Sequence, residues 1–170
     1  MKVYEIREIA RAWVEEQFSD QPDFIGAHLM GGMNELKPDD EFPAYSDVDM
    51  SIVLEGEGTN WPEETHHCGL MLEFGIEAAD DYRSLETLIA NPSLAPNLFV
   101  DSILVDPHHI LTQAHTFIAR EFTRRRWVQA RCEDERQKRI EPYIPTMTPD
   151  VLGTHMEFYN LWSICANLAG

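Results

Sequence analysis

Two segments in which apolar residues take every second position constrain the fold of this chain more than any other feature. The first spans residues 47–54 and the second spans residues 70–77. Their alternating apolar residues are Val48, Met50, Ile52 and Leu54 in the first, and Leu70, Leu72, Phe74 and Ile76 in the second. Because successive side chains of a strand point to opposite faces, each segment predicts a strand with one face in a hydrophobic core.

The rest of the chain divides into helical and extended patterns. Residues 3–18 repeat their apolar positions close to every 3.6 residues, which predicts an amphipathic helix, and residues 24–30 are a short apolar run typical of a buried strand. The other predicted elements are a turn or helical start followed by loop at 33–45, a loop with at most one helical turn at 55–69, a helix at 83–90, a strand at 99–105, a helix at 108–140, and a final helix that begins at Thr148.

These elements define an α/β (α+β) fold class, with a short mixed sheet flanked by helices and followed by a helical segment. We assign residues 1–118 to the α/β domain and residues 119–170 to the helical segment. The final helix is apolar on most sides and needs a partner, so it predicts either a homodimer interface or a larger helical domain.

Charge is distributed unevenly along the 170 residues, whose net charge is −17. Residues 1–119 hold five Lys and Arg against 23 Asp and Glu, whereas residues 120–170 hold eight against seven. An acidic surface repels phosphate backbones, which disfavours nucleic-acid binding, and it suits a small cationic partner.

No apolar run approaches the roughly 18 residues of a membrane span, and the first residues lack a signal-peptide core. We therefore expect a soluble, cytoplasmic protein.

The three cysteines, Cys68, Cys132 and Cys165, are far apart and form no CxxC pair. This spacing supports neither a disulfide framework nor a zinc ribbon, and buried reduced thiols are expected.

The basic stretch at residues 120–139 predicts a solvated helix with internal ion pairs, and its alternative role is to supply an arginine to a phosphate group.

Asp47 and Asp49 share the polar face of the first alternating segment. Residues two apart on a strand are separated by about 6.6 Å, so their carboxylates can converge on one or two metal ions. Hard oxygen ligands favour Mg²⁺ or Mn²⁺. Glu73, on the face of the next strand that also carries Glu77, completes the site if the two strands are neighbours; the alternative is that these acids face solvent.

Gly31 and Gly32 follow the buried strand at 24–30. Because glycine lacks a side chain and adopts unusual dihedral angles, such a pair lets backbone N–H groups approach phosphate oxygens. A glycine pair by itself is weak evidence for such a site, because an ordinary turn is its default explanation.

The stretch LMGG followed by SDVDMSIVL resembles the signature of the DNA polymerase β-like nucleotidyltransferase superfamily. LMLEFGIE resembles the strand that bears the third carboxylate of that superfamily, and NLFVDSILVDPHHIL resembles the strand and helix that follow. The resemblance covers about residues 24–118, and its layout is nearest to nucleotidyltransferases that modify aminoglycoside antibiotics.

This resemblance implies a role for each matching residue. The implied metal ligands are Asp47, Asp49 and Glu73, with Glu77 as a rival third ligand, and the implied nucleotide-binding residues are Gly31, Gly32, Ser46 and Lys37. The chain departs from the pattern at Gly32, where the superfamily often has serine, and in the length of the loop between Gly32 and Asp47.

The implied reaction moves a nucleoside monophosphate, AMP from ATP, to a hydroxyl of a small acceptor and releases pyrophosphate. An aminoglycoside-like acceptor would make this an antibiotic-resistance activity, and Glu157 is the candidate general base. The alternatives are a toxin-like enzyme that modifies a protein, an inactive domain that binds a nucleotide or partner, and a glycosyltransferase with an Asp-x-Asp motif.

Overall fold

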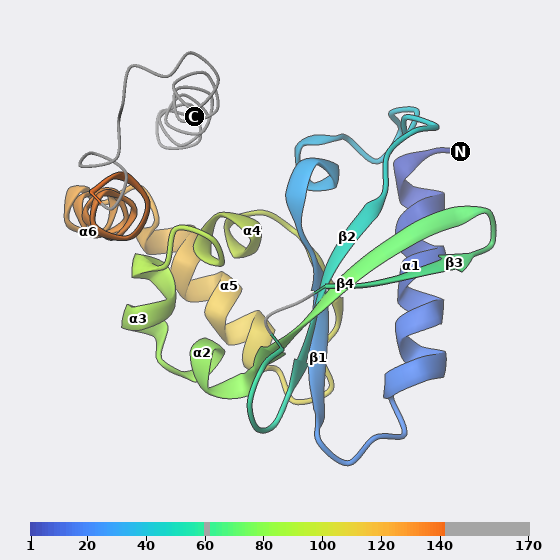
Figure 1. Ribbon diagram of the computed structural model, residues 1–170, viewed down its shortest axis with the longest axis horizontal. Coiled ribbons are helices and arrows are strands. Elements are labelled where there is room, and N and C mark those ends of the chain that lie inside the picture. The colour runs from blue at the N-terminus through green and yellow to red at the C-terminus, as the bar shows by residue number, and fades with distance from the viewer. Residues whose placement is uncertain (60–61, 142–170) are drawn as a thin grey trace, which may run out of the picture.

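The computed structural model describes residues 1–59 and 62–141 (Figure 1). Its elements, in chain order, are α1 (Val3–Phe18), β1 (Phe24–Leu29), the 3-10 helix η1 (Gly31–Glu35), β2 (Val48–Leu54), β3 (Glu63–His67), β4 (Leu70–Ala78), α2 (Ala79–Arg83), α3 (Leu85–Ala90), α4 (Ala95–Phe99), β5 (Ile103–Val105), α5 (Ile110–Glu121), α6 (Arg125–Glu135) and the π-helical turn η2 (Arg136–Ile140). Helix α1 and strands β1, β2 and β4 lie where the sequence predicts them.

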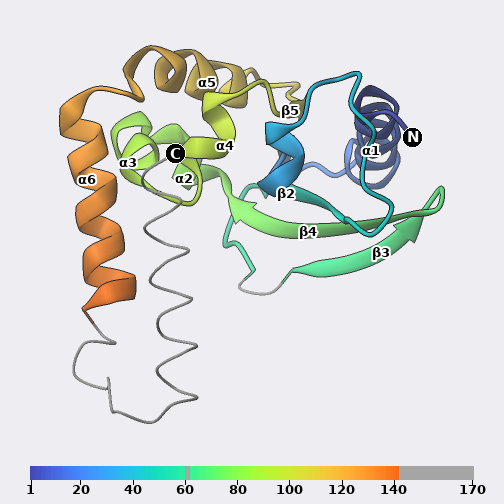
Figure 2. The same cartoon turned by 90° about the horizontal axis from the view of Figure 1, so that it is seen from above.

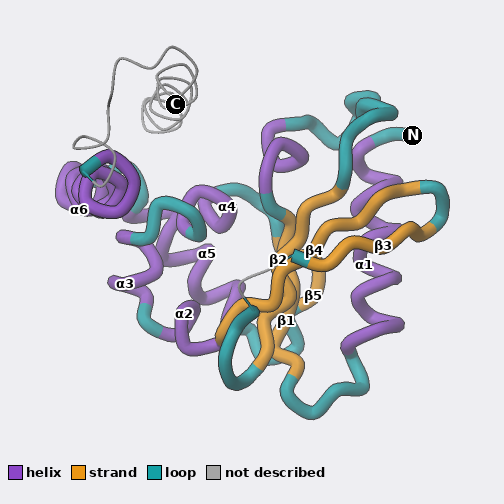
Figure 3. Tube along the Cα trace, viewed as in Figure 1, coloured by secondary structure: helices purple, strands orange, loops and turns teal. Residues whose placement is uncertain are grey.

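The five strands form one mixed sheet in the order β3-β4-β2-β1-β5, and β2 and β4 are its parallel pair. The other pairings are antiparallel. Strand β3 forms a hairpin with β4, so β4 returns beside β2 in the same direction. Helices lie on both sides of the sheet (Figures 1 and 3). The predicted α/β class with a mixed sheet is confirmed.

Two hydrophobic clusters hold the helices against the sheet. Helix α1 contributes Ile6 and Trp13 to the first cluster, where they pack with apolar residues of β1, β2 and β4 such as Met50. Helices α2 to α5 form the second cluster on the opposite face, around Ile25 and Val53. Strand β2 is thus covered on both faces near Val53, in contrast to the single core face that its sequence predicts, while Asp49 stays half-buried.

Several predicted boundaries are wrong. Residues 63–67 form strand β3 and not loop, and the predicted strand at 99–105 is the end of α4 followed by the three-residue β5. The predicted helix at 83–90 is α2 and α3, which begin at Ala79 and break at Ser84, and the predicted helix at 108–140 is α5 and α6. Figure 2 shows α6 on the far side of α3 from the sheet.

The basic stretch has a structural role at the break between α5 and α6. The buried carboxylate of Glu121 forms ion pairs with Arg120, Arg124 and Arg126. Arg131 is also buried, in contrast to the solvated helix that the sequence predicts, and its guanidinium donates to the carbonyl oxygens of Ile89 and Phe122. These contacts fix α6 against α3.

Other sequence predictions have different outcomes. Cys68 is exposed at the β3–β4 turn and Cys132 is half-buried, so their predicted burial is wrong. Among the described residues, no helix has the length and apolar character to cross a bilayer. The proposed boundary after residue 118 falls within α5, and the division into domains stays a prediction. The final helix, with Glu157, Cys165 and the proposed dimer interface, lies outside the described residues.

A buried polar chain lies between β1 and α2. The side chain of His28 is completely buried, with Nδ1 3.0 Å from the carbonyl oxygen of Leu29 and Nε2 2.9 Å from the Tyr82 hydroxyl. A carbonyl oxygen can only accept, so Nδ1 carries the proton and Nε2 accepts from Tyr82. Burial lowers the pKa of His28 from 6.5 to about 4, because the charged imidazolium loses its hydration.

We predict that His28 makes the protein less stable in acid. The unfolded chain binds a proton at His28 below about pH 6.5, whereas the folded chain binds it only near pH 4, so the His28 contribution is complete above pH 6.5 and is lost as the pH falls to 4. The loss is about 3 kcal/mol at most. Urea unfolding of wild type and His28→Gln between pH 4 and 7 measures it. Parallel pH profiles for the two proteins would refute the prediction.

Candidate metal centre

The parallel register of β2 and β4 brings acidic residues of both strands together. Asp49 of β2 is paired directly with Glu73 of β4, and Asp47 precedes Asp49 by two residues on the same side of the chain. Each of the three half-buried side chains offers one carboxylate oxygen, and these oxygens all lie within 4.8 Å of one another. The sequence prediction that Asp47, Asp49 and Glu73 lie together is therefore confirmed as geometry.

The electrostatics of this cluster favour a bound cation. Burial, and then the negative charges of Asp47 and Glu73, raise the pKa of the Asp49 carboxyl above its ordinary value of 3.8. Among the described residues, no Lys, Arg or His forms an ion pair with these three acids. Carboxylate oxygens are hard ligands that suit Mg²⁺ or Mn²⁺, so the residues fit a divalent metal.

The glycine turn, which we define as Met30 and the 3-10 helix η1, follows β1 and lies against this cluster. The backbone N–H of Met30 donates to the carbonyl oxygen of Asp49 at 2.8 Å, which extends the pairing of β1 with β2 by one residue. Gly31 has a φ of +64°, and a Cβ atom placed on it would lie 2.4 Å from Oδ2 of Asp49. Both the dihedral angle and the close approach therefore require glycine at position 31.

Gly32 has no such constraint. A Cβ atom at Gly32 would meet nothing within 4 Å, and its φ lies outside the left-handed region. The structure thus leaves room at position 32 for the serine that the superfamily often has there.

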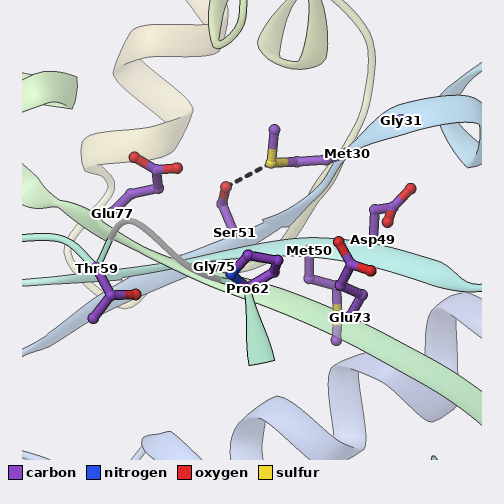
Figure 4. A pocket seen from close by; sticks show the side chains of 10 residues that line it. All are labelled: Met30, Gly31, Asp49, Met50, Ser51, Thr59, Pro62, Glu73, Gly75 and Glu77. Atoms are coloured by element: carbon purple, nitrogen blue, oxygen red, sulfur yellow. Dashed lines mark hydrogen bonds between the residues drawn. The ribbon is translucent and has the colours of Figure 1, made fainter. Parts of the chain in front are cut away.

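A pocket of about 330 Å³ opens beside the carboxylate cluster (Figure 4). Its lining includes Gly31 from the turn, Asp49 and Ser51 from β2, and Glu73 and Glu77 from β4. Ser51 is paired with Gly75, whose missing side chain leaves the middle of the pocket open. The lining contains no Lys or Arg among the described residues.

Glu77 lies apart from the carboxylate cluster. It is paired with Val53, four residues along β4 from Glu73, which corresponds to about 13 Å of strand. Figure 4 shows its carboxylate at the other end of the pocket from Asp49. Burial, and then the charge of Asp81, raise the pKa of Glu77. The geometry therefore favours Glu73 over Glu77 as the third acid of the cluster.

Of the four predicted nucleotide-binding residues only Gly31 lines this pocket, and Gly32, Lys37 and Ser46 do not. Lys37 is exposed in the loop after η1, and Ser46 lines a different pocket, of about 460 Å³, with Tyr45, His66 and Met71. None of the described arginines of the basic stretch lines the pocket beside the carboxylates.

Two residues near the cluster are not evident from the sequence. Glu64 of β3 is paired with Glu73, so it lies on the same face of the sheet, but the polar sequence of β3 gives no sign of a strand. Asn97 of α4 accepts a hydrogen bond from the Gly31 N–H at 3.2 Å, across 66 residues of sequence. No local pattern predicts a contact over that separation.

Comparisons with known proteins find a limited similarity to solved structures. No protein-family profile matches the sequence, and no curated protein matches it. A similar solved structure is that of a nucleotidyltransferase-like protein from Exiguobacterium sibiricum 255-15, with 15% sequence identity and a TM-score of 0.49. The match covers 70% of this chain and 40% of that chain, so this chain spans less than half the length of that protein.

We predict that substituting the two glycines has unequal effects. Gly31→Ala forces a side chain into the left-handed region and against Asp49, which should cost about 1–3 kcal/mol and weaken Mn²⁺ binding. Gly32→Ala, the matched control, should change stability by less than about 0.5 kcal/mol. Urea unfolding and Mn²⁺ titration of both variants measure the difference, and equal losses would contradict the geometry at Gly31.

We predict that Asp49→Asn changes thermal stability in opposite directions with and without metal. In EDTA the substitution removes a half-buried charge whose pKa is raised, so the melting temperature should rise by about 1–2 °C after allowance for solvent screening. In Mn²⁺ at about 100 times its dissociation constant, wild type should gain roughly 5–10 °C, and the variant should lose most of this gain.

Glu77→Gln is the matched control for this experiment. The pKa of Glu77 is also raised, so the substitution should stabilise the metal-free protein. The Mn²⁺ response should persist, because Glu77 lies outside the cluster. A normal Mn²⁺ response in Asp49→Asn, or its loss in Glu77→Gln, would show that the ligand set is wrong.

Proposed function

We propose that this protein is a metal-dependent nucleotidyltransferase that moves a nucleoside monophosphate, AMP from ATP, to a hydroxyl of a small acceptor and releases pyrophosphate. The observation that carries the proposal is the convergence of Asp49 and Glu73, from two parallel strands, with Asp47, which directly precedes the first of them, beside a glycine turn. A solvent-facing acidic turn would not require Gly31 to lie against a carboxylate. The resemblance of residues 24–118 to the nucleotidyltransferase signature supports the same activity.

The three carboxylates would hold Mg²⁺ or Mn²⁺, which when bound neutralises charge on the triphosphate and lowers the pKa of the acceptor hydroxyl. Asp49 belongs to β2 and Glu73 to its neighbour β4, so the sheet itself fixes their separation, and Asp47 directly precedes β2. The glycine turn would lie along the triphosphate, because Gly31 leaves no side chain between the backbone and Asp49.

In the proposed reaction the acceptor oxygen forms a bond to the α-phosphorus of the triphosphate. The bond between that phosphorus and the oxygen bridging to the β-phosphate breaks, and pyrophosphate leaves with the electron pair. The hydroxyl proton passes to a general base, for which Glu157 remains the candidate. In this scheme Asp47, Asp49 and Glu73 orient the two reacting groups.

The negative charge of the pocket lining supports a small cationic acceptor. Asp49, Glu73 and Glu77 give the lining a negative charge, and a net charge of −17 attracts cations to the protein. Glu77 lies far enough from the cluster to accept hydrogen bonds from an amino group while a hydroxyl of the same molecule approaches Asp49 and Glu73. An aminoglycoside-like antibiotic has both groups, and its modification would confer resistance.

We predict that the purified protein releases pyrophosphate from ATP and Mg²⁺ when a suitable acceptor from a panel of cationic aminoglycosides is present. Asp49→Asn and Glu73→Gln should each lower the rate by roughly 100-fold or more, because each removes charge that holds the reacting groups. Glu86→Gln, on the exposed side of α3, is the control and should retain wild-type activity. Pyrophosphate release and the mass of the acceptor measure transfer.

Three outcomes would contradict this function. Binding of nucleotide without turnover for any acceptor, including protein hydroxyls, would favour an inactive binding domain, which is consistent with glycine at position 32. Transfer to a protein and not to small molecules would favour the toxin-like alternative. Full activity in Asp49→Asn would remove the carboxylate cluster from the mechanism.

A further inference from the structure

Asn97 of α4 connects the helical side of the protein to the glycine turn. Its Oδ1 accepts hydrogen bonds from the Gly31 N–H at 3.2 Å and from Nδ2 of Asn34 at 3.1 Å. Its Nδ2 donates to the carbonyl oxygen of Ser93 at 2.8 Å. Because a backbone N–H can only donate, the carbonyl end of the Asn97 side chain must face the turn, and the three hydrogen bonds fix its orientation.

The turn that Asn97 holds is also the segment that touches Asp49. Met30 donates its N–H to the Asp49 carbonyl oxygen, and Gly31 packs against Oδ2 of the Asp49 carboxylate. Asn34 adds a second attachment, because its Nδ2 also donates to the carbonyl oxygen of Leu29 at the end of β1. The turn is thus attached to β2 on one side and to α4 on the other.

This arrangement limits what the turn can offer to a phosphate group. The Gly31 N–H is occupied by Asn97, so it is not available to a ligand. The next residue, Gly32, is exposed, and the space where its Cβ would lie is open. A triphosphate can therefore meet the turn only beyond Gly31, and the distance of that part from Asp49 depends on the bond from Gly31 to Asn97.

We propose that Asn97 is a positioning residue for the triphosphate. By holding Gly31, which lines the pocket beside the carboxylate cluster, it fixes where the open part of the turn begins relative to the cluster, so that one polyphosphate chain can contact both. Asn97 does not touch the substrate in this scheme and acts through the turn. The inference rests on the proposed function, because it requires a polyphosphate to bind between the turn and the metal ligands.

Loss of the Asn97 side chain should weaken the binding of polyphosphate more than the binding of metal. The carboxylates come from the sheet, which Asn97 does not hold, so the Mn²⁺ affinity of Asn97→Ala should stay within about 2-fold of wild type. The affinity for inorganic tripolyphosphate in Mg²⁺ should fall roughly 10-fold, since an unpaired Gly31 N–H lets the turn move. A purely structural role would lower both affinities together or neither.

Two further variants support this comparison. Asn91→Ala is the matched control, because Asn91 accepts bonds from the N–H groups of Ser93 and Leu94 in the same segment without touching the turn. Asn34→Ala removes the hydrogen bond that Asn34 donates to Asn97 at the turn. Within the described part of the chain, Oδ1 of Asn34 is buried without a hydrogen-bond partner, so this substitution also removes an unsatisfied acceptor and should fold.

The experiment measures tripolyphosphate binding in Mg²⁺ by calorimetry and Mn²⁺ binding by electron paramagnetic resonance for all four proteins. The expected result is a roughly 10-fold weaker tripolyphosphate affinity in Asn97→Ala, about 3-fold weaker in Asn34→Ala, and no change in Asn91→Ala. If Asn97→Ala does not fold, Asn34→Ala against Asn91→Ala decides the question in the same way.

Each contrary outcome has a separate meaning. Wild type that binds Mn²⁺ but no polyphosphate refutes both the proposed function and the role of Asn97. Wild type that binds both, with Asn97→Ala or a folded Asn34→Ala equally tight, refutes the role of Asn97 alone. Equal losses of Mn²⁺ and tripolyphosphate affinity in Asn97→Ala, or an equal loss in Asn91→Ala, show a structural role in place of positioning.

Discussion

The parallel pairing of β2 with β4 places Asp49 directly beside Glu73, and much of the site depends on this repulsive contact. Like charges opposite each other on neighbouring strands destabilise a sheet. Here the cost is increased by the burial of Asp49, whose pKa rises as a result. The pair persists because the apolar side chains on the opposite face, including Met50 and Phe74, pack against α1 and fix the register.

The glycine turn is likewise locally unfavourable and is held in place by contacts with the rest of the fold. A residue with positive φ packed against a carboxylate is unfavourable for any side chain, and Gly31 removes that cost. The turn then needs other contacts to hold its place, since glycine contributes none of its own. Backbone pairing with β2 and the hydrogen bonds of Asn97 and Asn34 provide them. The conformational freedom of Gly31 is thus combined with a fixed position of the turn.

The sequence predicts the parts of the fold that have a strong local period. Helix α1 and strands β2 and β4 each place a regularly spaced set of apolar residues in the cluster around α1, so the period is clear even though Val53 of β2 is buried on the other face. Strand β3 is missed because it is an edge strand of Glu, Thr and His residues whose side chains are mostly exposed, and no face of it enters the core. The break between α5 and α6 is missed because it depends on distant contacts, such as that of Arg131 with Ile89.

The same distinction applies to the site. Asp47 and Asp49 are evident from the alternation of β2, and Glu73 from that of β4, but the choice of Glu73 over Glu77 requires the register between the strands. Asn97 is beyond any local pattern, since its partners Gly31 and Asn34 are more than 60 residues away. Ser46 and Lys37 are close to the motif in sequence but do not line the pocket beside the carboxylates, because closeness in sequence does not determine position in the fold.

The pocket exists because the helices on one side cover only part of the sheet. Helices α2 to α5 pack over Ile25 and Val53, and this cover ends before Asp49 and Glu73, which stay half-buried on the same face. A fully covered face would have excluded the acids, and a fully open one would have left them solvated with ordinary pKa values. Partial cover raises the pKa of Asp49 and leaves a path for a cation to reach it. Helix α4 lies at this margin and carries Asn97, so the packing that limits the pocket also determines the position of the glycine turn.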